Sequence, residues 1–149
     1  MTDRPCRAIK VGRTQVKCFV KRGIDRTPTQ QLAGAVAPLS VSTPEATAYD
    51  LIRYASRIGG IERAAETIRP LLPLLRAREL KRVLDAPAVA QRLGFVIEAC
   101  GNKSLAKAVR DWLPDELTPV TLSPAKGKRD SLPLVKRWQV LNNSSELKV

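Results

Sequence analysis

The chain has 149 residues, a length at which one domain can bury a hydrophobic core without disulfides or a structural metal. Its formal net charge of +12 predicts attraction to phosphate groups, to an acidic protein or to an anionic surface. The sequence contains no histidine, which removes the commonest general base and metal ligand and excludes the simplest forms of most hydrolase mechanisms.

Cysteine usage and hydropathy indicate the compartment. Cys6, Cys18 and Cys100 form no C-x-x-C pair, so the sequence suggests neither a disulfide framework nor a structural zinc site. The N-terminus has no apolar core, and the longest apolar stretch, near residues 32–39, is too short to span a bilayer. We therefore expect one cytoplasmic domain over residues 1–149, without a cofactor, a metal or membrane contact.

The first predicted elements are strands. Residues 8–11 and 15–21 alternate with a period of two around a short turn, which predicts an N-terminal β-hairpin. Residues 21–31 have the composition of a loop, and residues 37–42 are predicted to form a third strand that leads into the first helix.

Basic side chains concentrate in this hairpin and just beyond it. Lys17, Phe19 and Lys21 would share one face of the second strand. A contact with nucleic acid or an acidic protein is one interpretation, and a solvated charged face is equally supported, because Phe19 offers only a thin stacking platform. We expect a flexible basic loop over residues 124–133 to extend the patch. The predicted contact residues are Arg7, Lys10, Arg13, Lys17, Lys21, Arg22, Arg26, Lys126, Lys128 and Arg129.

Two helix starts compete in the stretch VSTPEATAYDL. Ser42 and Glu45 have the spacing of a capping box, whereas Thr43 as N-cap places Pro44 at the first helical position. We favour Thr43, because a residue before proline resists the helical conformation. Glu45 is then explained by the positive end of the helix dipole. The buried stripe of this helix is predicted to hold Ala48, Leu51, Ile52, Ala55 and Ile58, and the helix to end at Gly59 and Gly60.

Four more helices are predicted from their periodic apolar residues. The second begins near Ile61 and is broken or kinked where Pro70 and Pro73 follow. The third lies within residues 76–86. The fourth begins at Pro87 and has a glycine C-cap, and the fifth covers residues 102–113. The inward residues of the fourth helix are predicted to be Val89, Leu93, Val96, Ile97 and Cys100. Those of the fifth are predicted to be Leu105, Ala108, Val109 and Trp112.

The C-terminal region is predicted to return to strands, at residues 117–123 and 134–140. Strands followed by about five helices and then by strands are typical of an α+β domain. We expect the C-terminal strands to join the same sheet as the N-terminal ones.

The other motifs are better explained by structural roles than by catalysis or ligand binding. The letters CGNKS lack the first glycine of a phosphate loop and follow a helix, so we interpret them as a helix cap with a surface lysine. Glu45 and Asp50 lie five residues apart on poorly matched helix faces, and no acidic cluster has the spacing of a metal site. A carboxylate-dependent enzyme or degenerate nuclease is therefore the least supported hypothesis.

Three segments, VSTPEATAYDLIRY, GGIERAAETI and RLGFVIEACG, together with the tryptophan of VKRWQVLNN, resemble the C-terminal domain of AbiEi-type antitoxins. That family belongs to type IV toxin–antitoxin systems, which act in abortive infection and phage defence. The resemblance is carried by structural motifs: Thr43, Pro44, Glu45, Gly59, Gly60, Arg92, Leu93 and Gly94.

The resemblance implies a non-enzymatic regulator that antagonises a cognate nucleotidyltransferase-type toxin and can assist transcriptional autoregulation. Family members typically join this domain to a promoter-binding winged helix-turn-helix, for which the present chain leaves no room before its hairpin. It is either a solitary antitoxin-like domain or a fragment. The alternative function is that of a basic DNA- or RNA-binding module that uses the N-terminal hairpin.

Overall fold

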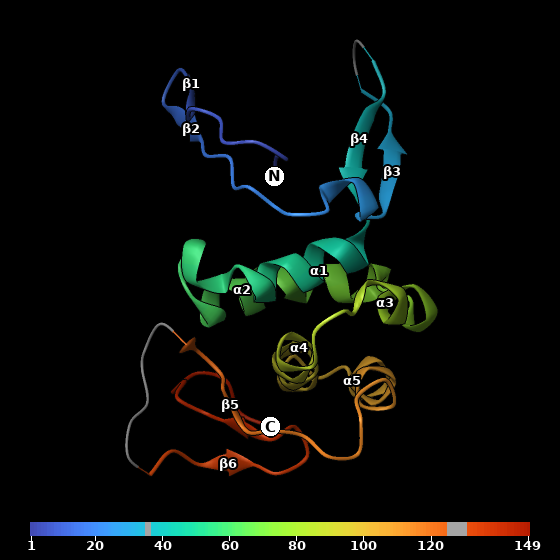
Figure 1. Ribbon diagram of the computed structural model, residues 1–149, viewed down its shortest axis with the longest axis vertical. Helices are drawn as coiled ribbons and strands as arrows, with labels where there is room; N and C mark the ends of the chain where they lie inside the picture. Colours follow the sequence, from blue (N-terminus) through green and yellow to red (C-terminus); the bar gives the residue numbers. More distant parts are fainter. Residues whose placement is uncertain (35–36, 125–130) are drawn as a thin grey trace.

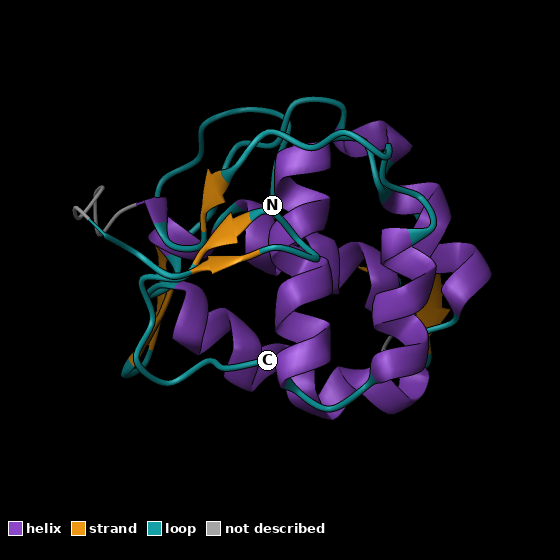
Figure 2. Cartoon of the chain, turned by 90° about the horizontal axis from the view of Figure 1, so that it is seen from below, coloured by secondary structure: helices purple, strands orange, loops and turns teal. Residues whose placement is uncertain are grey.

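The computed structural model describes residues 1–34, 37–124 and 131–149. Within these residues, two β-hairpins lie at one end of the longest axis, five α-helices form the middle, and a small sheet lies at the other end (Figure 1). Seen from below, the helices fill most of the body and the short strands lie around it (Figure 2). The α+β class expected from the sequence is confirmed.

The N-terminal hairpin is shorter than predicted. It pairs β1 (Ile9–Val11) with β2 (Thr14–Val16), and all of its strand residues are exposed. The chain beyond β2 leaves this ladder, because Val20 pairs with Thr2: the Thr2 amide donates to the Phe19 carbonyl at 3.0 Å. The alternation of residues 15–21 therefore belongs to two different pairings, and the predicted second strand was too long.

A second hairpin follows a 3₁₀ turn, η1 (Ile24–Arg26). It pairs β3 (Thr29–Leu32) with β4 (Leu39–Ser42) in antiparallel register. The strand β4 confirms the predicted third strand, whereas β3 lies where a loop was expected. Its sequence, TQQL, carries no apolar alternation, so its strand conformation comes from pairing with β4.

The first helix, α1 (Pro44–Arg53), begins as predicted. The Thr43 hydroxyl accepts a hydrogen bond from the Ala46 amide at 3.3 Å, and Pro44 occupies the first helical position. The helix ends earlier than expected, and a 3₁₀ turn, η2 (Ala55–Arg57), leads to Gly59. Gly59 and the following glycine both have φ near +105°, a conformation that favours glycine.

The remaining helices match their predicted positions. They are α2 (Ile61–Ile68), α3 (Ala77–Val83), α4 (Pro87–Ala99) and α5 (Lys103–Arg110), and the two prolines after α2 turn the chain into a 3₁₀ segment, η3 (Arg69–Leu74). The helix α4 is central, since Leu93, Phe95, Val96 and Ile97 are wholly buried. It packs against both α1 and α5 and forms the middle of the core.

The C-terminal strands do not join the N-terminal ones. They form a separate sheet of β5 (Val120–Thr121), β7 (Val140–Leu141) and β6 (Leu134–Val135), in that order. The expectation of one shared sheet was wrong, because the helices lie between the two ends of the molecule (Figure 1). The single strand expected at residues 134–140 was also wrong: a turn separates β6 from β7, and Gln139 within it has φ +49°.

One face of α4 attaches this sheet to the helical body. The Trp138 ring lies so close to Gly94 that a Cβ there would be 2.1 Å from its Cζ3 atom. The Trp138 indole N–H donates to the Glu98 carboxylate at 2.5 Å, and Arg92 Nε donates to the Thr121 carbonyl at 2.9 Å. The buried Gln91 side chain donates to the Trp138 carbonyl at 2.9 Å. The RLG motif thus serves the packing of the C-terminal sheet.

Candidate functional site

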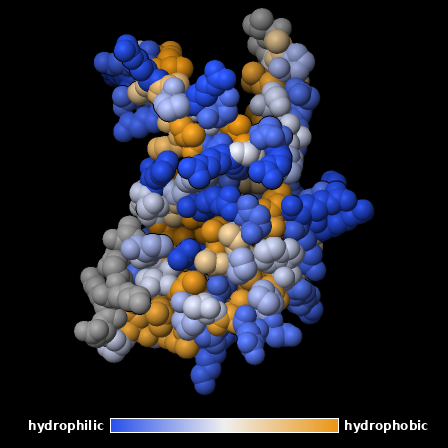
Figure 3. Space-filling model, in the orientation of Figure 1, coloured by the Kyte–Doolittle hydropathy of each residue, from blue (hydrophilic) through white to orange (hydrophobic). Residues whose placement is uncertain are grey.

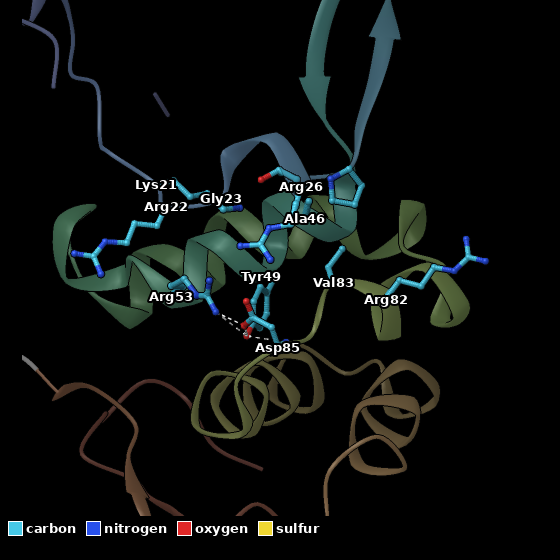
Figure 4. Close-up of a pocket in the computed structure, with 12 residues that line it drawn as sticks. Lys21, Arg22, Gly23, Arg26, Ala46, Tyr49, Arg53, Arg82, Val83 and Asp85 are labelled. Atoms are coloured by element: carbon cyan, nitrogen blue, oxygen red, sulfur yellow. Dashed lines mark hydrogen bonds and ion pairs between the residues drawn. The ribbon is translucent and has the colours of Figure 1, made fainter. Parts of the chain in front are cut away.

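A cleft of about 270 Å³ lies where the N-terminal segment crosses α1 and faces the end of α3 (Figure 4). We call it the cationic cleft, because five basic side chains line it and Asp85 is its one acidic lining residue among those described. Three basic residues come from the N-terminal segment, one from α1 and one from α3. They are Lys21, Arg22, Arg26, Arg53 and Arg82.

A hydrogen-bond network forms the floor of the cationic cleft. The Tyr49 hydroxyl donates to Asp85 Oδ1 at 2.5 Å and accepts from the Ala86 amide at 3.0 Å. Arg53 pairs with the same Asp85 carboxylate, and its guanidinium carbon lies 4.9 Å from the Tyr49 ring centroid. Burial, followed by the hydrogen bond to Asp85, raises the pKa of Tyr49 above its ordinary value of 10.0. The network joins α1 to the start of α4.

The remaining cations differ in their availability. Arg82 pairs with Glu79 at 2.9 Å, and its side chain extends away from the centre of the cleft (Figure 4). Arg22 and Arg26 are exposed, and neither forms an ion pair with any carboxylate in the described parts of the chain. Arg26 extends toward the side of Tyr49, whereas Arg22 extends outward (Figure 4). These two cations are the groups most available to an anionic partner.

Lys21 does not lie on an exposed strand face, as the alternation had predicted. Its ammonium pairs with Asp50 at 2.6 Å, and the two side chains are 10% and 9% exposed. The sequence offers no signal for this contact, since the partners are 29 residues apart. Lys21 therefore holds the N-terminal segment on α1.

The other predicted basic residues lie away from the cationic cleft. Arg7, Lys10, Arg13 and Lys17 are exposed on and around the first hairpin, which projects from the helical body (Figure 1). Hydrophilic residues cover much of both hairpins and the surface directly below them (Figure 3). Lys126, Lys128 and Arg129, with most of the loop at 124–133, lie outside the described residues.

Phe19 does not stand among the exposed cations as a stacking platform. It is half-buried, and the Arg57 guanidinium carbon lies 5.8 Å from its ring centroid. The same guanidinium carbon lies 5.7 Å from the Tyr54 centroid. Sequence reasoning missed Arg57 and the cleft residue Arg53. The available signal was the helical spacing of Tyr49 and Arg53, four residues apart on one helix face.

The two carboxylates considered for catalysis are engaged elsewhere. Glu45 is 5% exposed, and its Oε1 accepts from the Arg76 amide at 2.9 Å, where α3 begins. One oxygen of Asp50 pairs with Lys21. Glu45 thus interacts with the N-terminus of the helix to which it belongs, α1, as expected. It also interacts with the N-terminus of α3.

Across residues 1–34, 37–124 and 131–149, no group of three or more acidic or cysteine side chains could hold a metal ion. In the same residues, no helix has the length and apolar character needed to cross a membrane.

The comparison with known families identifies the part of the chain that carries the cleft. A family model described as the AbiEi antitoxin C-terminal domain matches residues 3–99. The match includes both hairpins and the helices through α4, and it ends before α5 and the C-terminal sheet, so Trp138 lies outside it. Searches of curated proteins and of solved structures returned no match.

Proposed function

The chain belongs to the AbiEi antitoxin C-terminal domain family, and on this basis we propose that it antagonises a cognate nucleotidyltransferase-type toxin. The family match over residues 3–99 is the observation that carries the proposal. Membership supports an antitoxin or regulatory role in a toxin–antitoxin system. We further propose that the toxin is a nucleotidyltransferase, that the system is of type IV and that it takes part in phage defence.

The charge distribution supports antagonism through the hairpin end of the molecule. Arg22 and Arg26 present guanidinium groups at the cationic cleft that pair with no carboxylate in the described parts of the chain, and the first hairpin adds exposed cations. Charge complementarity of this kind chiefly raises association rates and specificity toward an acidic or phosphate-bearing partner. The contact surface that we propose consists of Arg7, Lys10, Arg13, Lys17, Arg22 and Arg26, with Lys126, Lys128 and Arg129 as a further part.

Co-expression in a bacterial host tests the proposal. Cells that express the candidate nucleotidyltransferase alone should stop growing, and cells that also express this chain should recover. The control is Val96→Asp, which buries an unpaired carboxylate in α4 and should unfold the domain, so it should not restore growth. A failure of the unaltered, folded chain to restore growth would contradict the proposal.

A second candidate function is nucleic-acid binding by the first hairpin, which can assist transcriptional autoregulation. The observation that favours it is that Lys10, Arg13 and Lys17 are all exposed on or directly after a projecting hairpin. Phosphate contacts of this kind bind without sequence preference and release counterions.

Alanine substitution of Lys10, Arg13 and Lys17 together should weaken binding to duplex DNA equally across sequences. Each lost phosphate contact should also reduce the slope of log affinity against log salt by about one. The charge-matched control replaces Arg69, Arg78 and Lys103, which are exposed on other elements. Equal losses in the two triple variants would mean that net charge alone, and not the hairpin, attracts DNA.

A further inference from the structure

Two of the three cysteines, Cys6 and Cys18, lie near the open end of the first hairpin. The hairpin ladder ends where Ile9 pairs with Val16, and Cys6 precedes β1 while Cys18 follows β2. If the same register continued past this end, residues 6 and 7 would lie opposite residues 19 and 18. The hairpin therefore brings the two segments that carry these cysteines close together.

A second pairing joins the same two segments on the other side of the cysteines. Thr2 forms a parallel bridge with Val20, in which the amides of Thr2 and Lys21 each donate a backbone hydrogen bond at 3.0 Å. The ladder fixes residues 9–16, and the bridge fixes residues 2 and 20. Both cysteines lie between these two fixed points, so neither segment can move far from the other.

The thiols of Cys6 and Cys18 interact, and both can be reached from solvent. A side-chain hydrogen bond with Cys18, followed by desolvation, raises the pKa of Cys6 above its ordinary value of 9.0. Both thiols are free, and Cys6 is exposed whereas Cys18 is half-buried. A disulfide requires Cα atoms within about 7 Å of each other, a condition that paired backbone segments commonly meet. Cys100 lies elsewhere, at the end of α4 against the core.

We propose that Cys6 and Cys18 form a reversible disulfide with each other by exchange with an anionic small-molecule disulfide such as oxidised glutathione. The surrounding charge suits this class of oxidant. Arg7 and Lys17 each adjoin one of the cysteines in the sequence, and both are exposed. Cations next to a thiol attract an anionic reactant and favour the thiolate that attacks it.

The reaction proceeds in two thiol–disulfide exchanges. The exposed Cys6 thiol loses its proton to solvent, and its thiolate attacks one sulfur of glutathione disulfide. The S–S bond of the oxidant breaks, a mixed disulfide forms on Cys6, and one glutathione thiolate leaves. Cys18 then loses its proton and attacks the Cys6 sulfur, which forms the Cys6–Cys18 bond and releases the second glutathione thiolate. The two cysteines are oxidised, and the oxidant is reduced to two thiols that take up the two protons.

The cross-link would act on the surface that carries the first hairpin's cations. It closes residues 6–18 into a loop that contains Arg7, Lys10, Arg13 and Lys17. A two-stranded hairpin is marginally stable by itself, and all strand residues of this one are exposed. Because a disulfide restricts the unfolded chain, oxidation should fix the shape of the hairpin without altering its charge. This inference goes beyond the proposed function and does not depend on it.

Oxidation of the full chain tests the proposal. The dilute protein is incubated with glutathione disulfide, its remaining thiols are alkylated, and the intact mass and the tryptic peptides are measured. We expect the chain to lose two hydrogen atoms and to carry no glutathione. Trypsin should release residues 1–7 linked to residues 18–21, and a reductant should separate these two peptides.

Three serine variants locate the bond. Cys100→Ser should form the same linked peptides as the unaltered chain. Cys6→Ser and Cys18→Ser should not form them, and the remaining cysteine of the pair should instead retain one glutathione as a mixed disulfide. Intermolecular dimers in place of the linked peptides, or a bond that includes Cys100, would overturn the proposal.

A comparison of folded and unfolded protein shows whether the fold positions the thiols. At a fixed ratio of glutathione to glutathione disulfide, the ratio of linked to unlinked chain should be at least about tenfold higher in buffer than in denaturing urea. An equal ratio in the two conditions would mean that the native structure does not favour the bond, and the proposal would be wrong. The absence of any linked peptide in buffer would have the same meaning.

Discussion

At the scale of single residues, the contacts with most consequence join segments far apart in the sequence. Gly94 has no conformational requirement for glycine, since it lies inside α4 and is not among the positive-φ residues. Glycine is required there because the Trp138 ring occupies the place of a side chain. The sequence marks Gly94 as part of a motif, but the reason for it lies 44 residues away, in a turn that local patterns do not predict.

Gly94→Ala should therefore destabilise the domain, although the same change in a helix usually stabilises it by about 1 kcal/mol. The new Cβ would lie 2.1 Å from the ring, and overpacking of this kind costs about 1–3 kcal/mol. Urea denaturation measures the difference. In a Trp138→Leu background the cost should shrink or change sign; an unchanged cost there would show that the ring is not its source.

Tyr49 gives stability a specific dependence on alkaline pH. Its pKa is raised in the folded state by burial and by Asp85, so the fold holds the phenol proton more tightly than the unfolded chain does. The contribution is therefore full below the unfolded pKa of about 10 and is lost as the pH rises through the higher folded pKa.

The urea midpoint of the unaltered chain should fall more steeply between about pH 9 and about pH 11 than that of Tyr49→Phe. At neutral pH this variant should be less stable by about 1–3 kcal/mol, because the Ala86 amide and Asp85 lose a buried partner. Tyr54→Phe, which removes the other tyrosine hydroxyl, should keep the pH dependence of the unaltered chain. Parallel pH curves for all three would contradict the role of Tyr49.

At the scale of elements, the helices that local sequence patterns mark were predicted correctly. A strand that depends on pairing with another strand was missed. The Thr43-Pro44 start of α1 and the apolar stripes of α2 and α4 are local patterns, and they located these helices correctly. The strand β3 was missed because its residues are polar and its partner is supplied by β4. The turn between β6 and β7 was missed because it has neither glycine nor proline to mark it.

A buried ion pair joins the N-terminal segment to α1. Lys21→Met should leave Asp50 without its cation in a site that is 91% shielded, since its side chain is 9% exposed. Removing one partner of a buried pair costs about 3 kcal/mol or more. The segment should then detach and become sensitive to limited proteolysis, whereas Lys17→Met, at an exposed position, should resist as the unaltered chain does. Equal resistance of the two variants would mean that the pair contributes little.

At the scale of the whole molecule, the two ends have separate roles. The C-terminal sheet is attached to α4 by Trp138, Gln91 and Arg92, and the hairpin end presents the exposed cations. The excess of basic residues near the N-terminus predicted a charged surface there. The cationic cleft itself could not be predicted, because its lining residues come from segments that meet only after α1, α3 and the N-terminal segment have packed together.

We propose that antagonism of the toxin acts through the cationic cleft. Arg22 and Arg26 are the exposed, unpaired cations of the cleft in the described residues, so replacing both by glutamate cancels the net positive charge of its lining without removing a known structural contact. Arg69 and Arg78 are also exposed and do not line the cationic cleft, so the same replacements there change the net charge equally.

Growth of toxin-expressing cells should be measured with the unaltered chain and with each double variant, expressed at matched levels. We expect the unaltered chain and Arg69→Glu/Arg78→Glu to restore growth, and Arg22→Glu/Arg26→Glu to fail while remaining folded by circular dichroism. Full restoration by Arg22→Glu/Arg26→Glu would show that the toxin is antagonised through another part of the molecule.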